Sequence, residues 1–390
     1  MRGVFAHATT NLRSATFPGE RVVDWPAITK PDLTLRCPIC NLETVKSGII
    51  GARGVGKSTV FQALTGLAPV PGVVDARNRA RLGQIKVSDP RLDFLEQAYG
   101  SRKKVPVELT LLDFAPNPKE QKEGAALDPS LLPLIRDLDA LLLVVPEFAG
   151  RNVPLVAAIE SIEGELVFAD FDQAERRLER LKKEKGQVEF EQNALEKCLR
   201  WLEQGKPLRT FDLTAQEVQT FSSFGFLSRK PALAVINCDA DRATAVDDGL
   251  DVLQARGLEA FRLAAAFEAE LWELDADGRR ELLTEAGIAA PARDRLISAL
   301  YRHLGLITFY TAAEPEAHAW QLRSGASALE AADCIHSDIA RGFIRAEVVS
   351  YGDFAALGSD AKVKEAGKLR LEGRDYVMRD GDIIHVRFKV

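Results

Sequence analysis

One short stretch, "GARGVGKSTV" at residues 51–60, constrains the fold of this chain more than any other. It matches the pattern G-x-x-x-x-G-K-[S/T], with the apolar run "SGII" before it and the amphipathic segment "KSTVFQALTG" after it. A strand, a glycine-rich turn and a helix are the context in which this pattern binds phosphate. The required residues coincide by chance in roughly one in a hundred chains of this length. An ordinary glycine-rich turn is therefore a poor alternative.

The residues of this loop suit a nucleotide polyphosphate. Glycines let the chain curl so that its N–H groups converge on phosphate oxygens, and the following helix adds the positive end of its dipole. The Lys57 ammonium would neutralise phosphate charge, and the Ser58 hydroxyl is a candidate ligand for Mg²⁺. The predicted nucleotide-binding residues of the loop are Arg53, Gly54, Val55, Gly56, Lys57, Ser58 and Thr59.

A second magnesium ligand is expected at the end of a neighbouring strand. The segment "VELTLLDF" ends near Asp113, whose carboxylate could hold Mg²⁺ directly or through water. With the loop, this Asp predicts a metal site formed by Ser58 and Asp113.

Short apolar runs, typical of strands, alternate with segments of helical periodicity, and this alternation predicts an α/β fold. "DALLLVVPEF" and "KPALAVINCDA" are nearly continuous apolar runs, as expected of strands covered on both faces of a parallel sheet. We therefore predict a doubly wound, mostly parallel sheet of the P-loop NTPase type.

Two further regions differ in style from this α/β pattern. Residues 171–206 are charged and favour helices, with Leu178 and Leu181 on one apolar stripe and Leu195, Leu199 and Leu202 on another. This pattern predicts an antiparallel helical hairpin, and a solvated helix without a partner is the alternative. The last 87 residues mix strand-like and helical segments, with a predicted hairpin turn at Asp380-Gly381, and indicate a small α+β domain.

Bulk composition excludes some classes of protein. The 390 residues carry a net charge of −6, which argues against a chain that is basic everywhere but leaves room for a local basic face. No segment reaches the run of about 18 apolar residues that a membrane span needs. Five cysteines do not make a disulfide scaffold in a chain of this size, so we expect a cytoplasmic protein without membrane partners.

Residues 1–44 carry four prolines and no sustained period, which predicts an irregular N-terminal extension. A start codon placed too far upstream would also explain them, since "LETVKSGII" would make a natural beginning. Cys37 and Cys40 have the spacing of a zinc knuckle, but no second pair of ligands completes a site.

The phosphate loop and several C-terminal segments together resemble the sequences of the YchF/Obg-like ATPase family. The similar segments include "SALYRHLGLITFYTAA", "IHSDIARGFIRAEVVSYGDF", "EAGKLRLEGRDYVMRDGDIIHVRF" and "ELVFADFDQAERRLERL", and the resemblance covers residues 46–390. It implies an Obg-type P-loop G domain at 45–165 and 228–303, a helical-hairpin insertion at 166–227 and a C-terminal TGS domain of ubiquitin-like fold at 304–390. It also implies hydrolysis of ATP or GTP with Mg²⁺, a cytoplasmic location, and association with the ribosome or translation factors.

The sequence departs from this family at the parts that sense the γ phosphate. The family continues its strand-end Asp as Asp-x-Ala-Gly, whereas this chain has Asp113-Phe114-Ala115-Pro116. Proline has no N–H, so the corresponding hydrogen bond to phosphate cannot form. The family also has a Thr in a "TIEPN"-like segment, and the matching stretch here, "VPGVVDARNRARLGQIKV", has no Thr or Ser.

The base-reading segment is altered as well. Asn237-Cys238-Asp239-Ala240 keeps the Asn of the family but lacks its final carboxylate, which Asp239 or Asp241 could replace. We predict Asn237 and Asp239 near the base, and the sequence leaves ATP and GTP both open.

These features predict a monomeric nucleotide-binding protein near translation that hydrolyses slowly, and no Gln, His or Arg stands out as a substitute catalytic residue. The alternatives are an active ATPase or GTPase with relocated catalytic groups, and a scaffold that binds RNA or protein with a structural nucleotide. Six basic residues favour a surface for the RNA backbone, and their acidic neighbours favour a mixed solvated face. The basic residues are Lys362, Lys364, Lys368, Arg370, Arg374 and Arg379.

Overall fold

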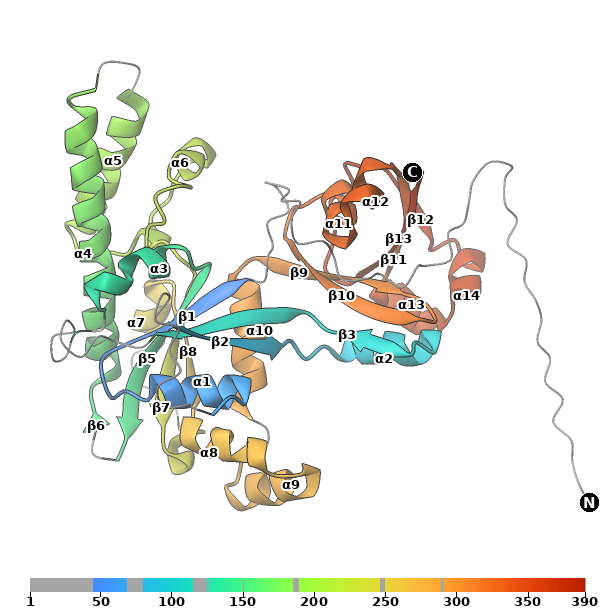
Figure 1. Ribbon diagram of the computed structural model, residues 1–390, viewed down its shortest axis with the longest axis horizontal. Helices are drawn as coiled ribbons and strands as arrows, with labels where there is room; N and C mark the ends of the chain where they lie inside the picture. The colour runs from blue at the N-terminus through green and yellow to red at the C-terminus, as the bar shows by residue number, and fades with distance from the viewer. Residues whose placement is uncertain are drawn as a thin grey trace, which may run out of the picture. The chain divides into compact units, whose positions relative to one another are not determined.

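The computed structural model describes residues 45–68, 80–114, 125, 127–149, 151–184, 189–245, 250–288 and 291–389 (Figure 1). Their contacts form two compact units. The larger unit holds the described residues of Leu42–Asp89 and Pro106–Ile307, and the smaller unit holds those of Pro90–Val105 and Thr308–Val390. Cys37, Cys40, Ala115 and Pro116 lie outside the described residues.

The larger unit is built on a mostly parallel sheet. Its strands are β1 (Lys46–Ile50), β2 (Ala80–Lys86), β4 (Glu108–Phe114), β5 (Ala140–Phe148), β6 (Arg151–Asn152), β7 (Ala232–Cys238) and β8 (Glu259–Leu263). They lie in the order β2-β4-β1-β5-β7-β8, with β6 paired to β5. β2 and β6 are antiparallel to their neighbours, and the other pairs are parallel. This architecture confirms the predicted α/β fold class.

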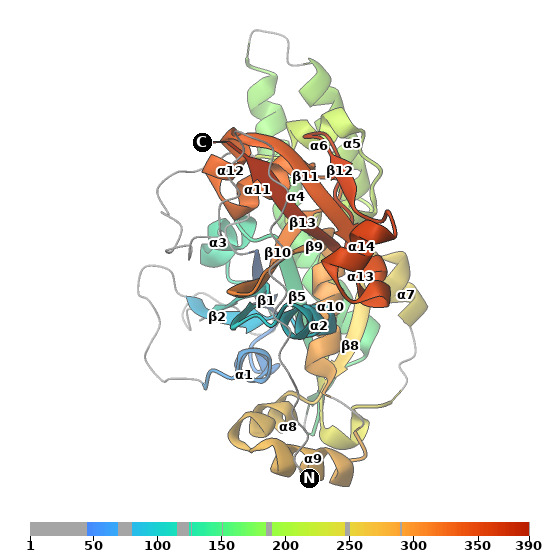
Figure 2. The ribbon, with the colours of Figure 1, turned by 90° about the vertical axis from the view of Figure 1, so that its right-hand side faces the viewer.

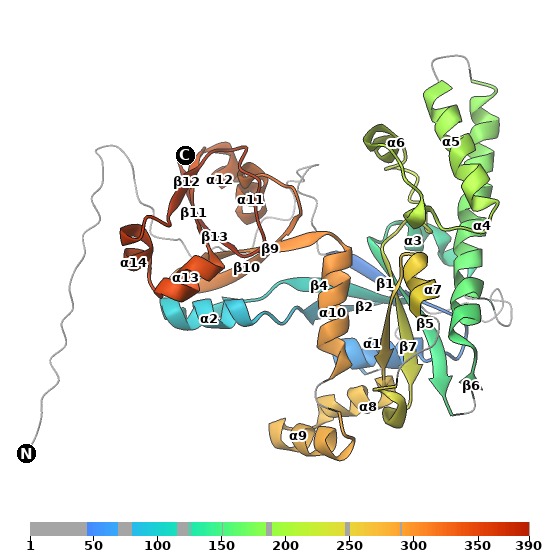
Figure 3. The same cartoon turned by 180° about the vertical axis from the view of Figure 1, so that it is seen from behind.

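Helices cover both faces of this sheet, which explains the continuous apolar runs of its central strands. On one face, Leu141 and Leu143 of β5 pack in a core with residues of α3, α4 and α7. Their neighbour Leu142 is also fully buried and points to the opposite face, because side chains alternate along a strand. α1 contacts β1, β2 and β4, and α10 contacts β7 and β8 (Figure 3).

The helices of the larger unit are α1 (Lys57–Thr65), α3 (Leu132–Arg136), α4 (Leu155–Leu181), α5 (Glu189–Leu202), α6 (Ala215–Thr220), α7 (Leu250–Ala255), α8 (Ala265–Glu270), α9 (Ala276–Glu285) and α10 (Ala292–His303). None of the described helices has both the length and the apolar character that a bilayer span requires.

The predicted helical hairpin is present and is formed by α4 and α5 (Figure 1). Leu178 and Leu181 of α4 are buried in one cluster with Leu195, Leu199 and Leu202 of α5. The alternative of a solvated helix without a partner is therefore wrong. α4 begins at Leu155, well before the charged segment, because its first turns pack against the sheet.

The smaller unit contains a six-stranded sheet with the order β12-β11-β13-β9-β10-β3 (Figure 2). Its strands are β3 (Lys103–Val105), β9 (Leu306–Ala312), β10 (Glu316–Arg323), β11 (Phe343–Ser350), β12 (Arg370–Glu372) and β13 (Asp382–Phe388). Its helices are α2 (Pro90–Tyr99), α11 (Ala328–Ile335), α12 (Ser337–Arg341), α13 (Tyr351–Leu357) and α14 (Asp360–Glu365).

The sequence did not predict that α2 and β3 would join the C-terminal residues. β3 extends the sheet by pairing in parallel with β10, and the rings of Tyr99 and Phe354 stack with centroids 5.0 Å apart. Such contacts join segments more than 200 residues apart and leave no local pattern. The domain boundaries given by the resemblance stay a prediction.

The hairpin turn predicted at Asp380-Gly381 is wrong. β13 pairs antiparallel with β11 and parallel with β9, so no adjacent strand precedes it through a tight turn. The dipeptide instead anchors the start of β13 to Thr308, whose N–H donates to the Asp380 carboxylate and whose carbonyl accepts from the Gly381 N–H.

We expect Asp170→Ala to destabilise the larger unit strongly. The fully buried Asp170 carboxylate accepts hydrogen bonds from the N–H groups of Leu227 and Ser228 and from the Ser228 hydroxyl. Removing it leaves buried donors unpaired, which should lower the free energy of unfolding in urea by about 3 kcal/mol. The control Asp172→Ala, on the same helix with an exposed Arg176 pair, should cost less than about 0.5 kcal/mol. Equal losses would contradict this account.

Candidate functional site

The predicted phosphate loop connects β1 to α1 at the carboxyl edge of the parallel sheet. Gly51, Gly54 and Gly56 have φ values of 152°, 78° and 88°, which residues other than glycine rarely adopt. A Cβ at Gly56 would lie 2.1 Å from the Asn237 amide nitrogen, and one at Gly51 would lie 2.5 Å from the Val144 carbonyl oxygen. Both positions therefore require glycine for conformation and for space.

The phosphate loop is partly buried and partly exposed, and its buried side chain is that of Val55. Val55 is 2% exposed, whereas Arg53, Gly54 and Ser58 are exposed. The Val55 side chain fixes the loop to the protein, so the main-chain N–H groups of the loop and the N-terminus of α1 can face a ligand. This end of α1 carries the positive end of the helix dipole and favours an anion.

Lys57 holds its ammonium over the loop. Its Nζ donates hydrogen bonds to the carbonyl oxygens of Gly51 and Ala52, at 2.7 and 2.8 Å. The flexible side chain brings a positive charge to the same side of the loop as the start of α1. It can exchange these carbonyl partners for phosphate oxygens, which form stronger, charge-assisted hydrogen bonds.

Asp113 joins the loop to the sheet through one carboxylate oxygen. Its Oδ2 accepts from the Ser58 hydroxyl at 2.9 Å, so the two residues predicted as magnesium ligands lie beside each other. The same oxygen accepts from Arg81 Nη2 at 2.5 Å. Arg81 was not predicted from the sequence. No local pattern pointed to it, because it is the antiparallel pairing of β2 with β4 that places Arg81 directly opposite Asp113.

The donor set at Asp113 fits a magnesium ion only in part. A hydroxyl and a carboxylate are ligands that Mg²⁺ accepts, and Asp113 Oδ1 is buried without a hydrogen-bond partner among the described residues. However, the Arg81 guanidinium already neutralises this carboxylate. A unit charge and a divalent charge about 5 Å apart repel by roughly 7 kcal/mol at an effective dielectric constant of about 20. Arg81 and a divalent cation would therefore compete for Asp113, so this carboxylate, paired as it is here, does not fit the ion.

The predicted base-site residues lie at the end of β7, beside the loop. Asn237 is 6% exposed and donates from its amide to the Val55 carbonyl at 3.0 Å. The exposed Asp239 carboxylate accepts from the Ala149 N–H at 2.8 Å. The structure thus brings Asn237 to the loop, whereas Asp239 holds the segment that follows β5.

A partly buried charge cluster lies at the same edge and was not predicted from the sequence. Arg242 and Arg262 both form ion pairs with Glu147, near the end of β5. Burial raises the pKa of the neighbouring Cys238 thiol, which therefore stays protonated at neutral pH. This cluster fixes the ends of β5 and β8 on either side of Asn237.

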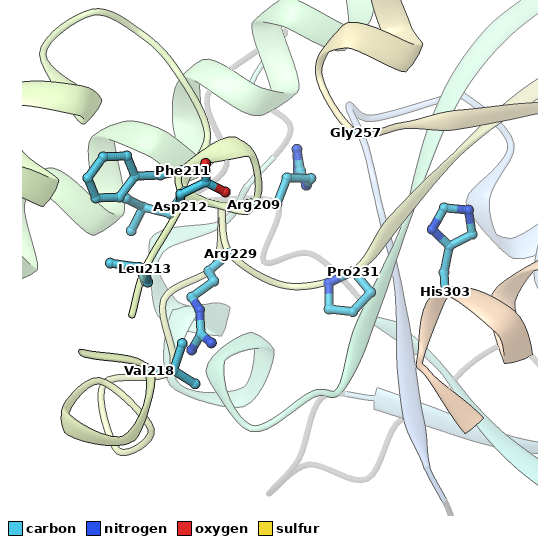
Figure 4. A pocket seen from close by; sticks show the side chains of 10 residues that line it. Arg209, Phe211, Asp212, Leu213, Val218, Arg229, Pro231, Gly257 and His303 are labelled. Carbon is cyan, nitrogen blue, oxygen red and sulfur yellow. The ribbon is translucent and has the colours of Figure 1, made fainter. Parts of the chain in front are cut away.

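A separate cavity of about 430 Å³ lies in the larger unit (Figure 4). Pro231 and Gly257 precede β7 and β8, so this cavity is at the amino edge of the sheet, away from the phosphate loop. Arg209 projects into it but is already held in an ion pair by the fully buried Glu163. The lining residues are Leu208, Arg209, Phe211, Asp212, Leu213, Val218, Arg229, Pro231, Gly257 and His303.

The basic residues of the smaller unit fall into two groups. Lys368 pairs with Asp353, Arg370 with Glu372 and Asp382, and Arg374 donates to the Phe343 carbonyl. Lys362 and Lys364 on α14 and Arg379 are exposed and form no ion pair with another described residue. The positive face is therefore smaller than the sequence suggested. No group of metal-ligating side chains large enough for a metal centre occurs in the described parts of either unit.

Known proteins resemble this chain over most of its length. The YchF-GTPase_C family model, described as a protein of unknown function (DUF933), matches residues 306–389. The "Ribosome-binding ATPase YchF" of Pasteurella multocida is 36% identical over 365 residues, which cover 88% of this chain and 99% of that protein. The protein of the same name from Bacillus subtilis is 36% identical over 362 residues, with the same coverage.

Solved structures agree with these sequence relatives. The Schizosaccharomyces pombe YchF GTPase has a TM-score of 0.76 and 28% identity, and the match covers 88% of this chain and 97% of that one. A GTP binding protein from Pyrococcus horikoshii OT3 has a TM-score of 0.54 and 17% identity, and covers 88% of this chain and 100% of its own. At that identity the second likeness concerns the fold alone.

We expect Gly56→Ala to disturb the loop beyond a simple conformational penalty. The substitution adds a Cβ at positive φ and displaces Asn237, so the free energy of unfolding should fall by about 3 kcal/mol. The control Gly205→Ala has a similar φ of 70° with no atom within 4 Å, and should cost only about 1 kcal/mol. Urea unfolding measures both variants, and a Gly56→Ala cost no larger than that of the control would contradict the described packing.

Proposed function

Because the chain belongs to the YchF family, we propose that it binds ATP or GTP in its phosphate loop, hydrolyses it slowly, and associates with the ribosome. The observation that carries the proposal is the loop itself. Three glycines at positive φ, a buried valine and an overlying lysine form a phosphate cradle at the head of α1.

Each part of the cradle has a role toward the nucleotide. The N–H groups of Arg53, Gly54, Val55, Gly56, Lys57, Ser58 and Thr59 would bind the phosphate oxygens. The Lys57 ammonium would neutralise the β and γ phosphates, and the Ser58 hydroxyl would face the same group. Asn237 orients the loop through Val55 and would lie at the base.

The proposed slow turnover rests on the sequence that follows Asp113. Hydrolysis requires a positioned water and donors that stabilise charge on the transferred phosphoryl group. Pro116 has no N–H to offer, and the stretch that matches the "TIEPN"-like segment has no hydroxyl side chain. An active enzyme would need catalytic groups in other positions.

The preference for the adenine or the guanine base depends on the side chains at the end of β7, near Asn237. A carboxylate that accepts two hydrogen bonds is what selects guanine, and Asp239 instead accepts from the Ala149 N–H. The hydrogen bond from Ala149 to Asp239 favours neither guanine nor adenine. Calorimetry with ATP, GTP and their diphosphates therefore decides the preference.

The proposed association with the ribosome is supported by the relatives, which are named ribosome-binding ATPases. The exposed Lys362 and Lys364 on α14 supply the positive charge that contacts to an RNA backbone need. A protein with this role works in the cytoplasm. Association should weaken steeply with salt, as expected when lysines neutralise phosphates.

We expect Lys57→Ala to weaken binding of ATP and GTP by about 100-fold, because two charge-assisted hydrogen bonds are worth about 3 kcal/mol together. Lys86→Ala removes an exposed lysine of the same unit and is the matched control, with affinity unchanged. Isothermal titration calorimetry measures both. Unchanged affinity in Lys57→Ala would place the nucleotide elsewhere.

The same variant separates a nucleotide switch from a scaffold. If Lys57→Ala loses nucleotide but still sediments with ribosomes as the wild type does, the scaffold alternative is correct. If sedimentation falls together with nucleotide affinity, the nucleotide controls the association.

We expect single-turnover hydrolysis no faster than about 10⁻³ s⁻¹, the rate typical of a P-loop protein that lacks its transition-state arginine. Release of inorganic phosphate from ATP and from GTP, in excess protein, measures it. Turnover of about 1 s⁻¹ or faster would favour an active enzyme with relocated catalytic groups.

A further inference from the structure

Arg81 lies beside Asp113, the residue predicted from the sequence to hold a magnesium ion. It is on β2, directly opposite Asp113 of β4, so main-chain pairing sets the approach of the two side chains. Its Nη2 and the Ser58 hydroxyl donate to the same Asp113 oxygen. The guanidinium is thus two hydrogen bonds from the first turn of α1.

Packing holds the guanidinium in this place. Its central carbon lies 4.6 Å from the centroid of the Phe61 ring, and the Arg81 side chain is only 17% exposed. Phe61 is itself 1% exposed and belongs to α1. Cation–π contact and burial therefore fix a permanent positive charge beside the loop.

We propose that Arg81 serves as a built-in cation at the phosphate site, so that this chain binds nucleoside di- and triphosphates without a divalent metal. The inference rests on the proposed nucleotide binding and specifies how the phosphate charge is compensated. A planar guanidinium carries five N–H donors, and its bond to Asp113 leaves others for phosphate oxygens.

An alternative is that Arg81 has only a structural role and holds β2 against β4. The Asp113 oxygen that accepts from Arg81 also accepts from Ser58 of the phosphate loop, so the ion pair contacts the loop as well as the sheet. A structural staple would leave the metal dependence of nucleotide binding unchanged. The charge role and the structural role therefore differ in a measurable quantity.

The test is calorimetric titration of the full chain with ATP and with ADP, in millimolar Mg²⁺ and in excess EDTA. For the wild type we expect the dissociation constants in the two conditions to differ by less than about threefold. Tightening of tenfold or more by Mg²⁺, about 1.4 kcal/mol, would overturn the inference. Absence of binding in both conditions would overturn the proposed function, and the inference with it.

Variants separate the charge from the packing. For Arg81→Ala we expect binding in EDTA to weaken by about tenfold or more and Mg²⁺ to restore most of that loss. Arg81→Lys keeps the charge and should stay insensitive to Mg²⁺. Arg280→Ala removes an arginine whose side chain is 75% exposed on α9 and should behave as the wild type.

Thermal unfolding of each variant reports whether it is folded. If Arg81→Ala does not fold, the wild-type comparison of Mg²⁺ with EDTA still decides. If Arg81→Ala folds and its affinity in EDTA equals that of the wild type, Arg81 is a structural staple and the inference is wrong.

Discussion

The turn of the main chain between β1 and α1 determines how the loop, the first helix and the neighbouring strands are arranged in the larger unit. Gly51 and Gly56 turn the main chain at positive φ, at two positions where a Cβ would clash with Val144 or Asn237. This turn aims the head of α1 at the carboxyl edge of the sheet. It also lets Asn237 of β7 bond the Val55 carbonyl across the top of β5. Loop, helix and two strands are thereby held in one arrangement.

The Asp113 carboxylate is already paired with side chains of the protein in this arrangement. Asp113 receives Ser58 from the loop and Arg81 from the edge strand, while Lys57 stays on the loop carbonyls. Among the described residues, Arg81 and a divalent ion would compete for the Asp113 carboxylate, whereas a polyphosphate would bring its own negative charge to Arg81, Lys57 and the head of α1. The role that we propose for Arg81 rests on this competition.

Local sequence patterns predicted most of the fold and the core of the candidate site. The loop, α1, the central strands and the hairpin all came from motif spacing or from apolar periodicity, which are properties of neighbouring residues. Arg81 was missed because its partner is 32 residues away and is chosen by strand register. The joining of α2 and β3 to the smaller unit was missed for the same reason. The hairpin predicted at Asp380-Gly381 was wrong because a turn dipeptide determines the local backbone geometry but not which strands pair on either side of it.

The most direct test of the account is a crystal structure of the chain soaked with ATP in the presence of EDTA. The account predicts phosphate oxygens within hydrogen-bond distance of the loop N–H groups, with Lys57 Nζ moved from the Gly51 and Ala52 carbonyls onto them. It also predicts the Arg81 guanidinium beside the terminal phosphate. A loop closed over its own lysine, with nucleotide elsewhere on the surface, would contradict the central claim.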